Sequence, residues 1–281
     1  MAYGFLPETR NLIRALAASA FTASPGPSDA TRSRLNDKRI DKPFVMLPTT
    51  TGITLAVDLG SAASPDTAAL LNHNFASVGA GTRSITVEGA DDALFSVNLV
   101  TCAAATLDST TSRPKDTCFS WAPVAKRYWR FIFAWTGGGS AAISVGEVAL
   151  GVATSLGRGE LDGSGEMERV RAPTVELSNG ATRAILLAGP VLERSLVFAD
   201  FTEAQRDILR TMWRDCKGPA VPVLWCESWA QTATMAVISA AAQKCLYGHL
   251  QMPEFGWRWS DWLLVKPPDI IIRSQGREVG A

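Results

Sequence analysis

Alternation of apolar and polar residues over short segments is the feature that most limits how this chain can fold. Every second residue is apolar from 53 to 59, and the pattern recurs at 85–87 and at 95–99. A period of two puts one side of a strand in a core and the other toward solvent. Glycine- and aspartate-containing turns separate these segments. The pattern predicts an all-β, mainly antiparallel fold, with a jelly-roll or discoidin-like β-sandwich.

The segment 128–135 is the most apolar of these strands. Trp129, Phe131, Phe133 and Trp135 share one face, and the other face also carries apolar side chains. Burial on both faces is typical of a central strand, so we expect 128–135 in the middle of the sheet. The alternation in 143–150 changes phase across Gly146-Glu147, which predicts a β-bulge.

The first fifty residues lack this pattern. Residues 8–20 predict one short helix, and the Pro- and Gly-containing cluster at 24–29 predicts a turn. Two prolines fall within 37–48. We therefore expect residues 1–50 to form an extended N-terminal arm with a short helix and little core of its own.

A glycine-rich stretch at 156–165 predicts a domain boundary. It separates a sandwich over 51–155 from a second, β-rich domain over 156–281. Asn179-Gly180 lies between apolar runs and predicts a hairpin. Further strands are predicted at 192–198, 221–226, 244–249, 255–265 and 270–272.

The second domain carries one strong helix signal. Thr202-Glu203-Ala204-Gln205 is a capping box, in which the Thr hydroxyl and the Gln side chain satisfy free amides at a helix start. Apolar residues then recur at helical spacing until Gly218-Pro219. The pattern predicts an amphipathic helix over 202–216.

The charge balance excludes some classes of partner. The chain has 27 Lys and Arg against 27 Asp and Glu, so it lacks the basic excess of a nucleic-acid-binding protein. Low net charge suits a subunit that packs against copies of itself. Residues 1–21 lack a basic segment before an apolar run, so no secretory signal is expected. The uncharged stretch 228–243 is too short to span a bilayer, so we expect no membrane insertion.

The five cysteines are Cys102, Cys118, Cys216, Cys226 and Cys245. No CxxC pair is present, which argues against a zinc ribbon or a thioredoxin-like site. The odd number and long spacings favour buried free thiols in a reducing cytosol. A bond between Cys102 and Cys118 stays open as an alternative.

Catalytic signatures are missing from the sequence. HExxH, GxxxxGK and intact GxGxxG are absent, and Asp162-Gly163-Ser164-Gly165 lacks the first glycine of a GxSxG elbow. We therefore expect no catalytic residue, no cofactor and no metal site, and a protein that is not an enzyme.

Two polar pairs are candidate ligand contacts. His73 and Asn74 could meet a ligand at a loop, but the apolar flanks favour a pair that closes a strand end by hydrogen-bonding the backbone. Asp91 and Asp92 could contact a ligand, and together with Asp58 and Asp66 they could ligate calcium, although turn chemistry is the stronger interpretation.

Tryptophan is unusually frequent, with nine Trp against three Tyr. Trp257, Trp259 and Trp262 form a run that could be core, a subunit interface or a sugar-stacking platform. Core is the default, and we name the three as candidate interface aromatics because Trp is enriched at interfaces.

Residues 53–151 resemble a phage-borne, discoidin-type galactose-binding-like β-sandwich. The segments that carry this resemblance are Val57-Asp58-Leu59-Gly60, 69–75, 85–89 with Asp91-Asp92, 127–130 and 145–151. The second half resembles tail-tip and baseplate proteins of tailed bacteriophages, such as distal or minor tail proteins, at 177–180, 194–198, 209–213 and 222–225.

The resemblance implies a structural virion protein of a phage tail tip or baseplate. It would form a ring or collar with copies of itself, contact tube, hub or fibre proteins, and be assembled in the bacterial cytoplasm. The alternative is a carbohydrate- or receptor-binding module on the tail that attaches to a host-surface glycan.

Overall fold

The computed structural model describes residues 4–24, 30–40, 42–49, 52–75, 78, 81–107, 115–137, 142–156, 165–169, 174–176, 182–184, 191–197, 201–226, 245–251, 258–261, 264–266 and 270–274. The chain divides into two compact units. The first comprises Met1–Gly157 and Leu224–Cys245, and the second Arg158–Val223 and Leu246–Ala281.

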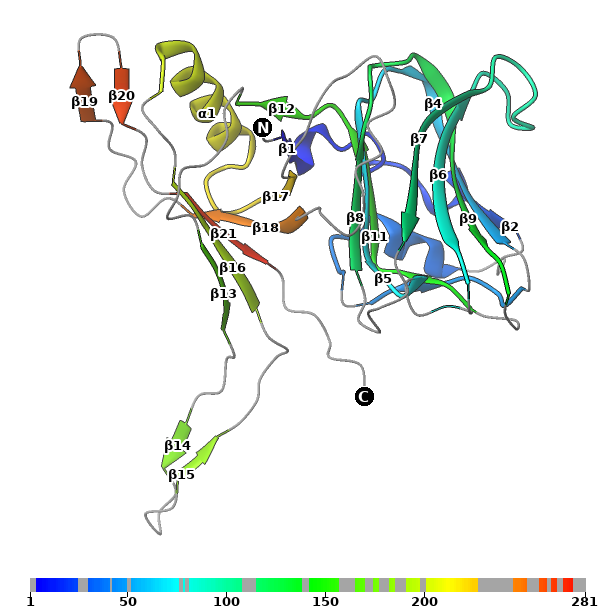
Figure 1. Ribbon diagram of the computed structural model, residues 1–281, viewed down its shortest axis with the longest axis horizontal. Helices are drawn as coiled ribbons and strands as arrows, with labels where there is room; N and C mark the ends of the chain where they lie inside the picture. Colours follow the sequence, from blue (N-terminus) through cyan, green and yellow to red (C-terminus); the bar gives the residue numbers. More distant parts are fainter. Residues whose placement is uncertain are drawn as a thin grey trace. The chain divides into compact units, whose positions relative to one another are not determined.

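The first unit is a two-layer antiparallel β-sandwich (Figure 1). One sheet has the order β2 (Phe21–Ser24), β4 (Gly52–Ala63), β9 (Lys126–Trp135), β6 (Arg83–Ala90) and β7 (Val100–Leu107). The other has the order β11 (Glu147–Gly151), β5 (Thr67–His73) and β8 (Lys115–Ser120). The all-β fold class predicted from the alternation is confirmed.

The sandwich core lies between the two sheets and is rich in aromatic rings. β9 is central, as predicted, and Trp129, Phe131, Phe133 and Trp135 are all buried. Phe75 packs edge-on against Phe133 and Trp135, with ring centroids 5.3 and 5.9 Å apart. Such edge-to-face packing adds to the stabilisation from buried area.

The N-terminal segment is not the extended arm that we expected. Its β2 pairs with β4, and Phe21 and Phe44 are buried in the sandwich core. The segment has few apolar partners of its own, so its large side chains bury more apolar area by packing on the sandwich. Its other strands are β1 (Gly4–Pro7), which pairs with β12 (Thr154–Ser155), and β3 (Phe44–Val45), which pairs with β10 (Ser144–Val145). The 3-10 helix η3 (Ala30–Leu35) precedes β3.

The single helix predicted over 8–20 is also wrong. Two short 3-10 helices form instead, η1 (Glu8–Arg10) and η2 (Ala18–Ala20). Between them the backbone bonds to β11, because Leu12 N donates to Leu150 O and Leu150 N donates to Asn11 Oδ1. These tertiary bonds replace the bonds of a continuous helix.

Two further strand predictions need correction. Residues 95–99 form a loop between β6 and β7, and Phe95 and Asn98 have positive φ angles of 56° and 48°. At Gly146 the chain does not bulge within one strand but passes from β10 to β11, which pair in different sheets. A Cβ at Gly146 would lie 2.5 Å from Ile40 O, so the crossing requires glycine.

The second unit is β-rich with one α-helix among its described residues. Its antiparallel sheet contains β13 (Gly165–Arg169), β16 (Val191–Leu196), β21 (Ile270–Ser274) and β18 (Cys245–Gln251). Two hairpins are present, β14 (Thr174–Glu176) with β15 (Thr182–Ala184) and β19 (Arg258–Asp261) with β20 (Leu264–Lys266). The first agrees with the hairpin predicted around Asn179-Gly180, a turn outside the described residues.

Helix α1 (Glu203–Asp215) confirms the predicted capping box. Gln205 N donates to Thr202 Oγ1, and Thr202 N donates to Gln205 Oε1. Leu209 and Met212 form its buried face. In the described part of the chain, every helix is too short or too polar to cross a membrane.

The cysteines differ from the expected free thiols. Cys118 of β8 is bonded to Cys226, the last residue of β17 (Pro222–Cys226), with 6.8 Å between their Cα atoms. Because Cys118 is bonded to Cys226, the alternative Cys102–Cys118 bond does not form. The partners are 108 residues apart, and only the fold brings them together.

Candidate functional site: the loop end of the sandwich

Three strands of the larger sheet end side by side at one end of the sandwich. Tyr128 of β9 pairs with Asp58 of β4 on one side and with Ala90 of β6 on the other. The loop 91–99 starts directly after Ala90. This register brings residues from distant parts of the sequence to one place, which we call the loop end.

Hydrogen bonds hold the loop 91–99 in one conformation. The Asp92 carboxylate accepts from Ser96 N at 2.9 Å, Val97 N at 2.7 Å and Ser96 Oγ at 2.8 Å. Asp91 N donates to Val97 O at 3.1 Å, and Asn98 Nδ2 donates to Asp91 Oδ2 at 2.7 Å. The two aspartates therefore act as internal braces, which agrees with the turn chemistry favoured for them.

Ion pairs surround the base of this loop. Arg127 makes a two-bond contact with Asp58 at 2.8 and 2.9 Å, and Lys126 Nζ lies 3.0 Å from Asp91 Oδ1. Arg130 NH2 lies 2.6 Å from Glu88 Oε2. Asp58 and Arg127 remain about one-third and two-fifths exposed, at 34% and 42%. Their polar atoms are thus fixed in position yet open to a ligand.

These contacts keep the carboxylates ionised. Hydrogen bonds from Arg127 hold the pKa of Asp58 below its ordinary value. The Asn98 side chain, then Lys126, lowers the pKa of Asp91, and the Val97 amide leads those that lower the pKa of Asp92. A carboxylate with a lowered pKa is a poor proton donor near neutral pH, so these three are unsuited to general acid catalysis.

Aromatic and aliphatic groups complete the loop end. The Arg127 guanidinium lies 4.8 Å from the centroid of the Tyr128 ring, and that of Arg130 lies 4.4 Å from the centroid of the Phe95 ring. The loop also presents an exposed aliphatic cluster of Leu94, Val97 and Leu99, which are 85%, 49% and 43% exposed. This arrangement can hydrogen-bond a polar ligand and contact an apolar one, and it fits binding better than catalysis.

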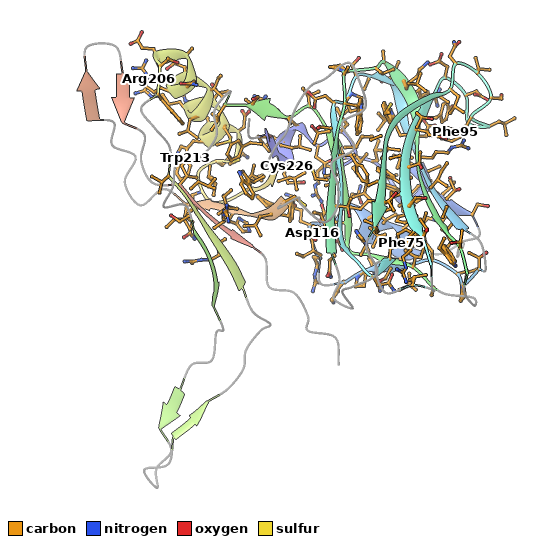
Figure 2. All side chains as sticks on the ribbon, in the orientation of Figure 1. Phe75, Phe95, Asp116, Arg206, Trp213 and Cys226 are labelled. Atoms are coloured by element: carbon orange, nitrogen blue, oxygen red, sulfur yellow. A yellow bond between two sulfur atoms is a disulfide. The ribbon has the colours of Figure 1, made fainter. Side chains whose placement is uncertain are left out.

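The two predicted polar pairs do not come together. His73 and Asn74 adjoin Phe75, which contacts Trp135, whereas Asp91 follows Ala90 opposite Tyr128. The span of β9 from 128 to 135 corresponds to about 23 Å at the usual rise per residue. Figure 2 shows Phe75 and Phe95 at opposite ends of the sandwich.

His73 and Asn74 have structural contacts. His73 is fully buried, with Nε2 2.8 Å from Thr117 Oγ1, and Phe75 N donates to its Nδ1. Asn74 Nδ2 donates to Ala142 O, and Ser144 N donates to Asn74 Oδ1 at 2.8 Å. These bonds fit the favoured interpretation of a pair that closes a strand end.

The candidate interface tryptophans fall mostly outside the described residues. Trp257 and Trp262 lie outside the described residues, and Trp259 belongs to β19 opposite Val265, with a side chain that is likewise outside them. In the described part of the chain, His, Cys, Asp and Glu side chains form no group of three that could hold a metal ion.

Sequence reasoning missed Arg127, Lys126 and Asn98 as parts of the loop end. The only available signal was the charge of Lys126-Arg127 just before the strongest strand. The partners of Lys126 and Arg127 lie at least 35 residues away in the sequence, whereas Asn98 bonds to the nearby Asp91.

In comparisons with known proteins, the chain is similar to solved structures only. No family model and no curated protein sequence matches the chain. Chitosan-binding module 1 of a chitosanase/glucanase from Paenibacillus sp. IK-5 has a TM-score of 0.38 at 19% identity, and covers 50% of this chain and 97% of its own. The CBM32 of AlyQ in complex with 4,5-unsaturated mannuronic acid has a TM-score of 0.33 at 21% identity, covering 47% and 92%.

A third neighbour is the lectin domain of lectinolysin complexed with Lewis B antigen. Its TM-score is 0.37 at 14% identity, and it covers 52% of this chain and 99% of its own. With TM-scores below 0.5, these likenesses assign neither a ligand nor a family to the chain.

Proposed function

We propose that the chain is a non-catalytic binding protein whose sandwich holds a carbohydrate at the loop end. The observation that carries this proposal is the braced loop 91–99, whose polar and apolar side chains stay exposed although its backbone is fixed. A surface ordered before binding loses little conformational entropy when a ligand arrives.

The chemistry of the loop end suits hydroxyl-rich ligands. Asp58, Asp91 and Asn98 offer oxygen acceptors, while Arg127 and Asn98 offer N–H donors. Tyr128 supplies an aromatic ring beside them, although Arg127 occupies one of its faces. The titles of the structural neighbours name chitosan, mannuronic acid and Lewis B antigen as ligands of those proteins, which makes these glycans the natural probes to try first.

The second candidate is a structural subunit, the role that the resemblance to phage tail-tip proteins implies. The exposed aliphatic cluster favours this candidate, because burial of Leu94, Val97 and Leu99 against another protein would be favourable in free energy. In that case the chain would assemble into a ring of copies, with other tail proteins as neighbours.

A glycan array probed with the full chain tests the first candidate. We expect binding that falls about tenfold or more in Arg127→Ala, because the variant loses a charged donor at the site. Arg210→Ala is the matched control, since this arginine of α1 has a similarly exposed side chain at 39%. Silence across the array, or equal binding by both variants, would reject the proposal.

Light scattering of the purified chain tests the second candidate. A stable oligomer that dissociates in Leu94→Ser would favour the structural subunit. A monomer at all concentrations would count against it.

A further inference from the structure

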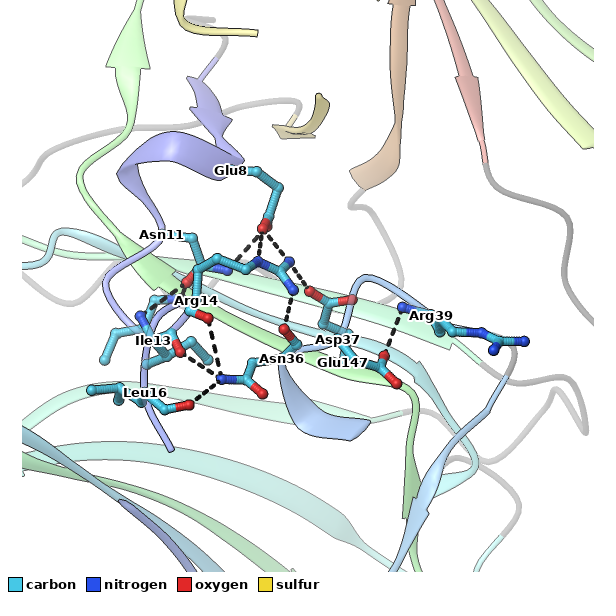
Figure 3. Close-up of polar contacts among 10 residues, drawn as sticks. Glu8, Asn11, Ile13, Arg14, Leu16, Asn36, Asp37, Arg39 and Glu147 are labelled. Carbon is cyan, nitrogen blue, oxygen red and sulfur yellow. Dashed lines mark hydrogen bonds and ion pairs between the residues drawn. The ribbon is translucent and has the colours of Figure 1, made fainter. Parts of the chain in front are cut away.

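A buried ionic cluster fastens the N-terminal segment to the smaller sheet. On β11, Val148 and Leu150 belong to the core between the sheets, so Glu147 lies on the opposite face by strand alternation. There Glu147 contacts Arg14 of the N-terminal segment. Arg14 also binds the carboxylate of Glu8 and the backbone oxygen of Asn36 (Figure 3).

Arg14 is the centre of the cluster. Its guanidinium donates to the carboxylates of both Glu8 and Glu147 and to the backbone oxygen of Asn36. Asn11 Nδ2 donates to Glu8 Oε1 at 3.0 Å, and Asn36 Nδ2 donates to Ile13 O at 2.8 Å. The cluster therefore connects three segments that are distant in sequence, namely residues 8–14, the turn at Asn36 and β11.

The charges in the cluster do not balance when both carboxylates are ionised. Two negative groups then share one positive group, and the side chains of Glu8 and Glu147 are only 3% and 0% exposed. Among the described residues, none donates a hydrogen bond to the buried Glu147 Oε2. An uncompensated buried charge is costly, so the site favours one bound proton.

The surroundings place that proton on Glu147. Burial raises the pKa of Glu147 to about 8, Arg14 opposes the rise, and Glu8 and Asp37 add to it. On β5, the paired residue Leu71 and its neighbour Asn72 are neutral. Asp116 of β8 is the next carboxylate on this sheet, and it accepts from Asn72 N at 2.8 Å.

We propose that this cluster is a pH-sensitive switch that controls the attachment of residues 8–16 to β11. With Glu147 protonated, Glu8 and Arg14 form a balanced pair and the segment stays attached. With Glu147 ionised, the excess negative charge loosens the segment.

The direction of the pH effect follows from proton linkage. A folded-state pKa raised from 4.5 to about 8 means that the attached state holds a proton which the detached state releases. Attachment is therefore strongest at low pH and weakens as the pH rises through this window, by up to about tenfold per pH unit. Above the folded-state pKa the effect levels off.

Hydrogen exchange of the full chain between pH 6 and 9 tests the switch. The reporter is the Leu12 amide, which bonds Leu150 O at 2.8 Å. After correction for intrinsic exchange, we expect its protection to fall with rising pH in the wild type and to stay nearly flat in Glu147→Gln. Glu203→Gln is the control, because Glu203 is exposed on α1 and should keep the wild-type slope.

A second variant keeps the test decisive if Glu147→Gln folds poorly. Glu8→Gln leaves Arg14 to pair with Glu147 alone, so the pH window should move downward. Flat protection in the wild type, or wild-type slopes in both Glu147→Gln and Glu8→Gln, would overturn the proposal.

Discussion

Replacing Phe21 with alanine tests whether the N-terminal segment is part of the sandwich. Phe21 is fully buried on β2, pairs with Val57 of β4 and belongs to the same core cluster as the sandwich strands. Removing a buried Phe side chain costs about 3–5 kcal/mol of unfolding free energy, because the cavity adds to the lost burial. For a unit of this size, that corresponds to a fall of roughly 6–20 °C in Tm.

Chemical denaturation of the full chain, followed by tryptophan fluorescence, measures the effect. Trp129 and Trp135 lie in the same core and report on its unfolding. Leu94→Ala is the control, since this side chain is 85% exposed and its loss should change the free energy by less than about 0.5 kcal/mol. If Phe21→Ala behaved like Leu94→Ala, the segment would be a separate arm and the fold described for it would be wrong.

Three other predictions follow from the described contacts. Alkylation of the denatured, unreduced chain should modify three cysteines and reduction should expose two more, Cys118 and Cys226; five reactive thiols before reduction would disprove the bond. Thr202→Ala should destabilise α1 by about 0.5–2 kcal/mol, seen as lost helical circular dichroism at intermediate denaturant, whereas no change would show that the cap is unimportant. The stability of the first unit should decrease from pH 5 to pH 8 in the wild type but not in Glu147→Gln, measured by thermal unfolding; a rise over this range would contradict the raised pKa of Glu147.

Sequence patterns predicted those parts of the fold that depend on residues close together in the sequence. The alternation at 128–135 identified the central strand, in which Trp129, Phe131, Phe133 and Trp135 are buried and the residues between them are half-buried. The capping box identified the start of α1, since its two hydrogen bonds join residues three positions apart.

Features that depend on distant partners escaped prediction. The run 95–99 alternates like a strand, but Asp92 binds its amides and turns it into a loop. Residues 8–20 contain apolar residues at helical intervals, but Arg14 and Asn11 bond to residues more than 130 positions away. Tertiary contacts override local preference in both cases.

The candidate site was predicted only in part. Asp91 and Asp92 do belong to the loop end, where they brace the loop 91–99 through hydrogen bonds within it. Arg127 joins them through the register of β4 and β9, which no local pattern specifies.

We propose that this protein binds carbohydrate through the loop end. The most direct measurement is hydrogen exchange of the full chain with and without the strongest glycan found on the array. We predict new protection confined to residues 91–99 and 126–128. Protection at the opposite end of the sandwich, around Asn74, or only in the second unit would contradict the claim.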